Sequence, residues 1–167
     1  PTVHLFWGFW DPPRPLPPAV TKCRRTWNRL GFPVRIWTPS DLKSIVYEMP
    51  DGKQVWGACS NIQKCDMARY ALMYKRGGLY ADIDCVPSKK IAESLKGDLS
   101  FFLETIWVND EVCQSFAKRY AIREGKPEVP VRIANYAMCA RVPGHKVWLK
   151  IWRTARDRLL RFPDPPK

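Results

Sequence analysis

The spacing of apolar positions divides the chain into short strands and amphipathic helices. Short runs rich in β-branched and aromatic residues predict strands over residues 2–9, 34–38, 79–83, 99–104 and 133–141. Three-four spacing of apolar residues predicts helices over residues 19–30, 40–47, 61–76, 91–95, 115–123 and 146–160. A strand, a helix and a second strand open the chain, which is the unit of a parallel sheet with a crossover connection. The pattern therefore predicts an α/β fold.

Two segments do not follow either period. Residues 11–18 (DPPRPLPP) hold five prolines, which exclude a helix or a central strand there. Directly after the first strand, this segment is expected to be an ordered loop over the edge of the sheet. Residues 49–57 are rich in turn-forming residues and are expected to form a connection.

Residues 61–84 (NIQKCDMARYALMYKRGGLYADID) combine a helix, a Gly-Gly break and an apolar run. Ser60 or Asn61 is expected to cap the helix, and Gly77 to end it. Asp66 and Arg69 are three residues apart and should share a helix face. The face predicted to be half-buried carries Ile62, Cys65, Ala68, Leu72 and Lys75 or Arg76.

Two aspartates follow the apolar run, and in an extended chain Asp82 and Asp84 would project to the same side. Neighbouring carboxylates repel, and a divalent cation such as Mg²⁺ or Mn²⁺ relieves the repulsion unless one carboxylate is protonated. With ten aspartates in the chain, an Asp-x-Asp is expected by chance about 0.6 times, so the pair is informative only in its context.

Composition is typical of a globular protein. With 167 residues, of which 46% are apolar, the chain fits one domain with a real core. Residue 1 is a proline, so a chain trimmed at one or both ends is expected. No apolar run approaches the length of a transmembrane helix. The compartment is left open: a cytoplasmic location is favoured for the chain as given, and the Golgi lumen is the alternative if an N-terminal anchor was removed.

The net charge of +12 suits an anionic partner, such as a nucleotide diphosphate, a nucleic acid or a membrane surface. The basic residues are scattered along the chain, and we interpret the groups within residues 22–29 and 153–161 as solvated helix faces rather than a nucleic-acid stripe. The six cysteines form no Cys-x-x-Cys and no Cys/His spacing for zinc. They are interpreted as buried thiols, with disulfides left open.

The order of these features resembles the DXD-containing sugar transferases, a family that includes fungal initiating mannosyltransferases and α-1,4-galactosyl- and N-acetylglucosaminyltransferases. The matching residues are Asp66, Arg69 and Tyr70, followed by LMYKRGGLYADID. The spacing of Asp66, Arg69, Tyr80, Asp82 and Asp84 is also similar to that in the clostridial glucosylating toxins. The resemblance extends over about residues 3–155 and is strong at residues 62–84.

The resemblance implies a single GT-A domain over residues 1–167, with a Rossmann-like, mostly parallel sheet flanked by helices and a DXD loop after a central strand. It implies transfer of a sugar from a nucleotide diphosphate to a hydroxyl acceptor on a glycan, lipid or protein. A UDP-sugar is favoured over a GDP-sugar, with retention of anomeric configuration and Mn²⁺ or Mg²⁺ as the cofactor. No nucleic-acid partner is expected, a membrane-surface partner stays open, and so does the oligomeric state.

The resemblance also implies roles for individual residues. Asp84 would hold the metal and Asp82 would assist, while Asp66 binds sugar hydroxyls and Arg69 the sugar or diphosphate. The base pocket and its surroundings would be formed by Phe6, Trp7, Gly8 and Tyr80. Further candidates are Asn135 for the donor, His145 as a third metal or phosphate ligand, and Glu104, Trp107 or Asp110 on the acceptor side.

Each assignment has a structural alternative. Asp66 and Arg69 would otherwise be an exposed helix pair, Trp7 a core residue, and His145 a surface residue at a helix start. At the level of function the alternatives are a metal-dependent phosphodiesterase or nuclease, a basic nucleic-acid-binding module and a non-catalytic sugar-nucleotide binder. The nuclease would need more clustered ligands than two histidines suggest, and the nucleic-acid module leaves the paired aspartates unexplained.

Overall fold

A computed structural model of the chain describes residues 1–10, 12–104 and 132–161. The chain divides into two compact units, residues 1–100 with 136–167, and residues 101–135. The first unit holds most of the described elements. The predicted helix at residues 115–123 lies outside the described residues.

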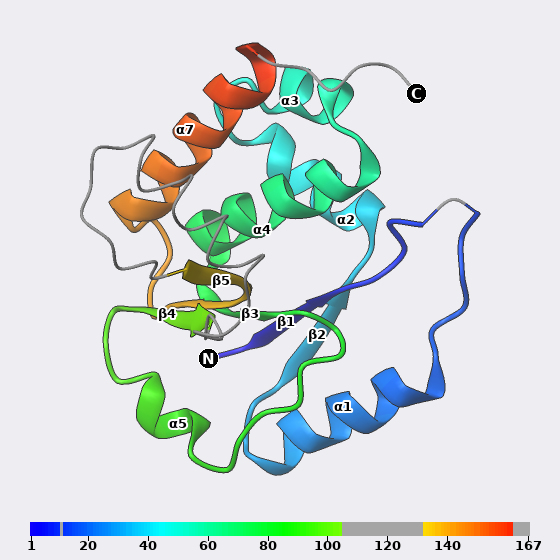
Figure 1. Ribbon diagram of the computed structural model, residues 1–167, viewed down its shortest axis with the longest axis vertical. Helices are drawn as coiled ribbons and strands as arrows, with labels where there is room; N and C mark the ends of the chain where they lie inside the picture. The colour runs from blue at the N-terminus through cyan, green and yellow to red at the C-terminus, as the bar shows by residue number, and fades with distance from the viewer. Residues whose placement is uncertain (11, 105–131, 162–167) are drawn as a thin grey trace, which may run out of the picture. The chain divides into compact units, whose positions relative to one another are not determined.

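A five-stranded sheet has the order β2-β1-β3-β5-β4 (Figure 1). Its strands are β1 (Val3–Phe6), β2 (Val34–Trp37), β3 (Gly78–Ala81), β4 (Leu99–Glu104) and β5 (Arg132–Ala140). β1 runs parallel to both β2 and β3, with Val3 opposite Val34 and Leu79, whereas β5 is antiparallel to β3. The predicted α/β fold with a parallel centre is confirmed, and this arrangement is consistent with a GT-A-like fold.

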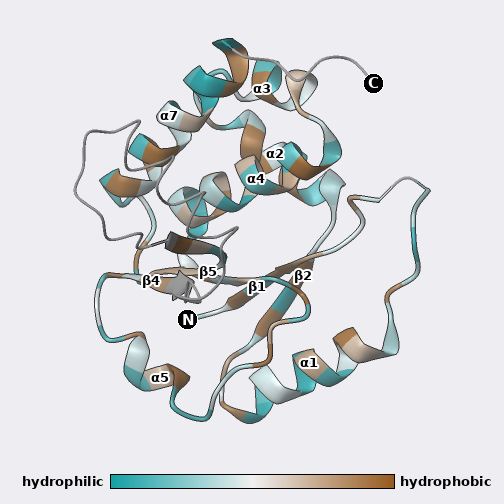
Figure 2. Ribbon diagram, viewed as in Figure 1, coloured by the Kyte–Doolittle hydropathy of each residue, from teal (hydrophilic) through white to brown (hydrophobic). Residues whose placement is uncertain are grey.

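Helices lie on both sides of the β1–β2 part of the sheet (Figure 1). α1 (Pro18–Arg29) lies on one side, and α4 (Asn61–Arg76) lies on the other with three further helices, α2 (Pro39–Tyr47), α3 (Gly52–Ala58) and α7 (Lys146–Arg161). The short α5 (Ile91–Ser94) precedes β4. Figure 2 shows hydrophobic and hydrophilic bands along α1 and α7, as expected for amphipathic helices. Within the described ranges, no helix combines the length and apolar character needed to cross a membrane.

Local sequence explains where the helices begin. Thr38 and Asp41 form a capping box at the start of α2, and Ser60 and Gln63 form another at the start of α4. α1 begins at Pro18, where a proline is tolerated because the first helical amides have no partner. Gly77 ends α4 with a φ of 64°. The predicted helix boundaries are therefore confirmed to within a residue or two.

Four local predictions were wrong. Residues 52–58 form α3 instead of a turn-rich connection, with Val55 and Trp56 buried against the rest of the unit. The first strand spans only Val3–Phe6 and the third ends at Ala81, before the aspartates. Ile62 was placed on the buried face of α4 but is 78% exposed, because the buried face is the one carrying Met67, Ala68, Ala71 and Leu72.

The core of the first unit lies between α4, α7 and the sheet. Leu5, Leu72 and Leu79 are completely buried, as are two tryptophans of α7, Trp148 and Trp152. The Trp152 indole N–H donates to the Pro50 carbonyl at 3.1 Å, so it joins α7 to the connection between α2 and α3.

His4 is a buried polar residue in the middle of β1. Its Nδ1 accepts from the Trp37 indole at 3.0 Å, so Nε2 is the nitrogen that donates to the Gly77 carbonyl at 3.1 Å. Both contacts require neutral imidazole in one tautomer. Burial lowers the pKa of His4 to about 4, the Gly77 hydrogen bond opposes this and the Arg35 charge adds to it. His4 therefore connects β1 to β2 and to the turn between α4 and β3.

The neutral state of His4 predicts a loss of stability in mild acid. In the unfolded chain histidine titrates at about 6.5, so between that pH and about 4 the unfolded state binds more protons than the native state does. The free energy of unfolding should fall by about 3 kcal/mol as the pH decreases through this window. Urea denaturation at several pH values measures it. His4→Gln should be less stable at pH 7, but its free energy of unfolding should no longer fall by this amount between pH 6.5 and about 4. An unchanged pH dependence in that variant would contradict the role of His4.

Candidate functional site

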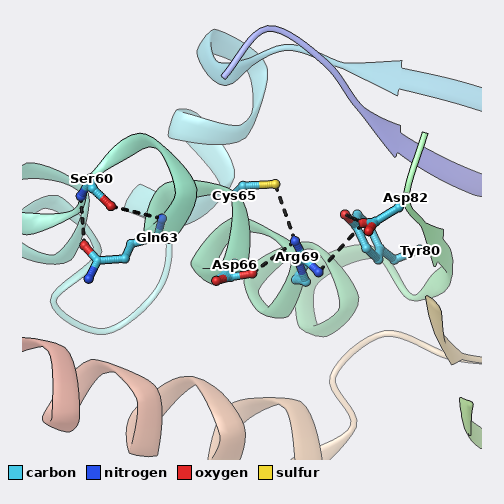
Figure 3. Close-up of polar contacts among 7 residues, drawn as sticks. All are labelled: Ser60, Gln63, Cys65, Asp66, Arg69, Tyr80 and Asp82. Atoms are coloured by element: carbon cyan, nitrogen blue, oxygen red, sulfur yellow. Dashed lines mark hydrogen bonds and ion pairs between the residues drawn. The ribbon is translucent and has the colours of Figure 1, made fainter. Parts of the chain in front are cut away.

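Residues from α4 and from the end of β3 meet around one guanidinium group (Figure 3). Arg69 Nη2 lies 3.0 Å from Asp66 Oδ1 and 3.6 Å from the Cys65 sulfur, and Nη1 lies 3.9 Å from Asp82 Oδ1. Asp66 and Cys65 come from the same helix, three and four residues before Arg69, whereas Asp82 follows β3. The predicted shared face of Asp66 and Arg69 is thus confirmed, and it faces the predicted DXD motif.

Arg69 is buried, whereas Asp66 and Asp82 beside it are partly exposed. Its side chain is 7% exposed, compared with 37% for Asp66 and 39% for Asp82. Burial raises the pKa of Asp66, the Arg69 charge opposes this, and the Asp82 charge adds to it. The guanidinium therefore holds two acidic groups at the surface of the site while staying out of solvent itself, which excludes an ordinary exposed helix pair.

Tyr80 connects the guanidinium to Asp82. The Arg69 guanidinium lies 4.7 Å from the centre of the Tyr80 ring, and the Tyr80 hydroxyl donates to Asp82 Oδ1 at 2.5 Å. Burial raises the pKa of Tyr80 far above its usual value, so the phenol stays protonated and keeps its donor. On the other side the ring packs edge-on against Phe6 at 4.8 Å. Asp82 is therefore oriented by two groups that are themselves held in the core.

The two aspartates occupy a turn instead of an extended strand. The Cys85 amide donates to the Asp82 carbonyl at 2.9 Å, closing a four-residue turn over residues 82–85. The expectation of an extended chain at both aspartates was wrong, because β3 ends at Ala81 and a turn follows it. Asp84 is exposed at the tip, and among the described residues its carboxylate has no hydrogen-bond or ion-pair partner.

The chemistry of the turn fits a hard divalent cation. Both contacts of the Asp82 carboxylate to described side chains are made through Oδ1, and the Asp84 carboxylate faces solvent. Among the described residues there is no cluster of three or more His, Cys, Asp or Glu able to hold a metal. Two carboxylates completed by substrate phosphates and water are a usual Mg²⁺ or Mn²⁺ arrangement, and the turn offers two.

The predicted base-pocket residues lie at the end of β1. Phe6 is 5% exposed and belongs to the core with Tyr80. Trp7 is half-buried: its indole N–H donates to the Arg14 carbonyl at 2.9 Å, and its ring lies 4.3 Å from that of Trp10. A Cβ on Gly8 would come 3.2 Å from Pro39 Cδ, so β1 and the start of α2 approach closely there. Trp7, with Trp10 exposed beside it, is the aromatic surface available at this edge.

The remaining predicted site residues belong to other elements or lie outside the described residues. His145 precedes α7, and its Nδ1 accepts from the Val147 amide at 3.3 Å. Asn135 lies in β5, within the second unit, and is exposed. Glu104 is the last residue of β4, and its side chain is outside the description, as are Trp107 and Asp110 entirely.

Several residues around the site were not predicted from the sequence. Cys65 could have been found, because it lies one helical turn before Arg69 on the same face. Tyr136 could not: its carbonyl accepts from the Asp82 amide at 2.7 Å, a contact that depends on β5 pairing with β3. The hydrogen-bond partners of Cys85, which come from α1, could not have been predicted from the sequence either.

Comparisons with known proteins agree with this arrangement. Residues 31–102 match the family model described as glycosyltransferase sugar-binding region containing DXD motif. The match ends within β4 and includes α4, β3 and the turn that carries both aspartates. No solved structure matches the chain significantly.

One curated relative extends the comparison. The chain is 32% identical over 108 residues to inositol phosphoceramide mannosyltransferase 1 of Schizosaccharomyces pombe (strain 972 / ATCC 24843). The match covers 60% of this chain and 32% of the relative, so the chain spans about a third of the length of the relative that it matches. The two matches support the DXD glycosyltransferase family and confirm the resemblance inferred from residues 62–84.

Proposed function

We propose that this chain forms the donor-binding part of a metal-dependent glycosyltransferase. It would move a sugar from a nucleotide diphosphate to a hydroxyl acceptor, with a UDP-sugar favoured over a GDP-sugar. The supporting observation is the ion-pair set in which Arg69 contacts both Asp66 and Asp82. This set brings a helix face suited to sugar hydroxyls next to a turn suited to a cation.

Asp84 and Asp82 are proposed to hold Mn²⁺ or Mg²⁺. When bound, the metal would supply Lewis-acid stabilisation of the diphosphate leaving group. Tyr80 and Arg69 hold Asp82 in one orientation, which reduces the entropy lost when a cation binds. His145 stays a prediction as a third ligand. Because its Nδ1 accepts from the Val147 amide, Nε2 carries the proton of the neutral ring, so in this arrangement His145 would donate to a phosphate and would ligate a metal only after giving up that hydrogen bond.

The donor sugar is proposed to lie beside Asp66 and Arg69. A carboxylate that is partly exposed, as Asp66 is, can accept hydrogen bonds from sugar hydroxyls. Arg69 would act mainly by holding Asp66 and Asp82, since only 7% of its side chain is exposed. The exposed part of Trp7 is proposed as the stacking surface for the base, while Phe6 and Gly8 shape the end of β1 behind it.

The relative is named for mannosyl transfer to inositol phosphoceramide, so a mannosyl donor and an inositol-phosphate acceptor form the first pair to assay. Retention of configuration is expected, with the leaving diphosphate accepting the proton of the acceptor hydroxyl on the same face. An inverting reaction would instead need a side-chain base near that hydroxyl, for which Glu104 and Asp110 remain the candidates.

A thermal-shift panel with UDP and GDP, each with and without Mn²⁺, tests the donor and the metal together. A ligand at 100 times its Kd stabilises the native state by about 2.7 kcal/mol, which corresponds to about 5–10 °C in Tm for a chain of this size. We expect a shift of this order with one nucleotide, and only when Mn²⁺ is present. A shift without Mn²⁺ would contradict the metal assignment.

Two further readouts separate the alternatives. A larger, salt-sensitive shift with DNA or RNA than with either nucleotide would favour the nucleic-acid-binding module. Metal-dependent nucleotide binding without donor hydrolysis or transfer would favour a non-catalytic sugar-nucleotide binder.

A further inference from the structure

Helix α1 contacts the turn that carries the two aspartates, through residues that are not part of the DXD motif. We propose that Cys23 and Trp27 of α1 are positioning residues that fix the conformation of residues 82–85 and thereby the location of Asp84. The inference rests on the proposed function in one respect, namely that this turn holds the metal.

The turn is held at both ends by groups from distant parts of the sequence. At its beginning, the Asp82 amide donates to the Tyr136 carbonyl of β5 at 2.7 Å. At its end, the Cys85 carbonyl accepts two hydrogen bonds, from the Cys23 thiol at 2.8 Å and from the Trp27 indole N–H at 3.1 Å. Asp84 lies between these two anchors, so displacing either one would move its carboxylate.

Cys23 and Trp27 are rigidly placed donors. They lie four residues apart on the inner face of α1 and are 4% and 3% exposed. The Trp27 ring also packs edge-on against Phe32 at 5.8 Å. Burial raises the pKa of the Cys23 thiol, the Trp27 hydrogen bond opposes this and the Asp84 charge adds to it, so the thiol keeps its proton and stays a donor.

The side chain of Cys85 gives the turn a further contact with β5. Its sulfur lies 3.9 Å from the Tyr136 carbonyl, the same carbonyl that accepts from the Asp82 amide.

The alternative is that these hydrogen bonds only stabilise the fold. Trp152 provides a matched control, because it is a second buried tryptophan whose indole N–H donates to a backbone carbonyl at 3.1 Å, that of Pro50. Pro50 is in the connection between α2 and α3, away from residues 82–85 in the sequence. Both Trp27→Phe and Trp152→Phe should lower stability, but only Trp27→Phe should affect the turn.

The first measurement uses the full chain without ligand. Hydrogen exchange of the Cys85 amide, which closes the turn, should become at least about tenfold faster in Trp27→Phe and stay unchanged in Trp152→Phe, after allowance for global stability. The Asp82 amide, held by β5, should be protected in both variants. Equal protection of the Cys85 amide in Trp27→Phe and wild type would overturn the proposal.

The second measurement is Mn²⁺ affinity in the presence of UDP or GDP. Residues that orient metal ligands without touching the metal typically change its affinity by 10–100-fold, so we expect about tenfold weaker binding in Trp27→Phe and less than twofold in Trp152→Phe. Cys23→Ala should weaken binding in the same direction, while Cys23→Ser, which keeps a donor, should restore it.

The outcomes separate this inference from the proposed function. If wild type binds no Mn²⁺ with either nucleotide, the proposed function fails, and hydrogen exchange alone still decides whether α1 holds the turn. If wild type binds Mn²⁺ and Trp27→Phe binds it equally well, the proposed function stands and the positioning role is overturned.

Discussion

Replacing Asp84 with alanine is expected to lower Mn²⁺-dependent donor hydrolysis or sugar transfer by at least about 100-fold, equivalent to about 2.7 kcal/mol of transition-state stabilisation. Asp84 is the exposed carboxylate of the turn, and among the described residues it forms no hydrogen bond or ion pair. Its removal should therefore cost little stability, so a loss of function can be assigned to metal binding.

Asp98→Ala is the matched control for this variant. Asp98 is also an exposed aspartate, in the connection before β4, and its backbone carbonyl makes the hydrogen bond to Arg141 that the substitution leaves in place. It should retain wild-type Mn²⁺ dependence. Undiminished hydrolysis or transfer by a folded Asp84→Ala protein would remove the glycosyltransferase hypothesis in its metal-dependent form.

Replacing Gly78 with alanine is expected to lower the free energy of unfolding by about 3 kcal/mol or more, which urea denaturation measures. Gly78 has a φ of 88°, and an added Cβ would lie 2.5 Å from His4 Nε2 and 2.7 Å from the Thr2 carbonyl oxygen. The Thr2 carbonyl also accepts the amide of Leu79 at 2.9 Å, so the new methyl group would force β3 away from β1.

Gly57→Ala controls for the general effect of removing a glycine. Gly57 lies in α3, and an added Cβ there meets nothing within 4 Å. This variant should be neutral or more stable by about 0.5–1 kcal/mol, since alanine favours helix and restricts the unfolded chain. A Gly78→Ala protein within about 1 kcal/mol of wild type would contradict the close approach of β1 and β3.

Elements whose signals are local were predicted well from the sequence. The limits of α4 follow from Ser60 at one end and Gly77 at the other, because capping and positive φ depend on neighbouring residues only. α3 was missed, since its glycines and short length resemble a turn, and its helix is stabilised by burying Val55 and Trp56. Tertiary packing there outweighs a weak local preference.

The same division applies to the site. The spacing of Asp66 and Arg69 predicted their ion pair, because three residues along a helix bring side chains to one face. The register of Arg69 with Asp82 was suggested only by resemblance to the DXD sugar transferases. The turn at residues 82–85 was mistaken for extended chain, because an apolar run does not reveal where a strand stops pairing.

By itself, the sequence determined the α/β order of elements, the caps of α4 and the presence of an acidic pair next to a helix carrying Asp66 and Arg69. Only the tertiary structure decided that Arg69 is buried between two carboxylates and that α1 and β5 hold the turn bearing Asp84. The physical reason is how far apart in the sequence the interacting residues lie. Helix faces and caps depend on residues within one turn, whereas the contacts of Cys85 with Cys23 and Trp27 span about 60 residues and form only when the sheet and α1 pack together.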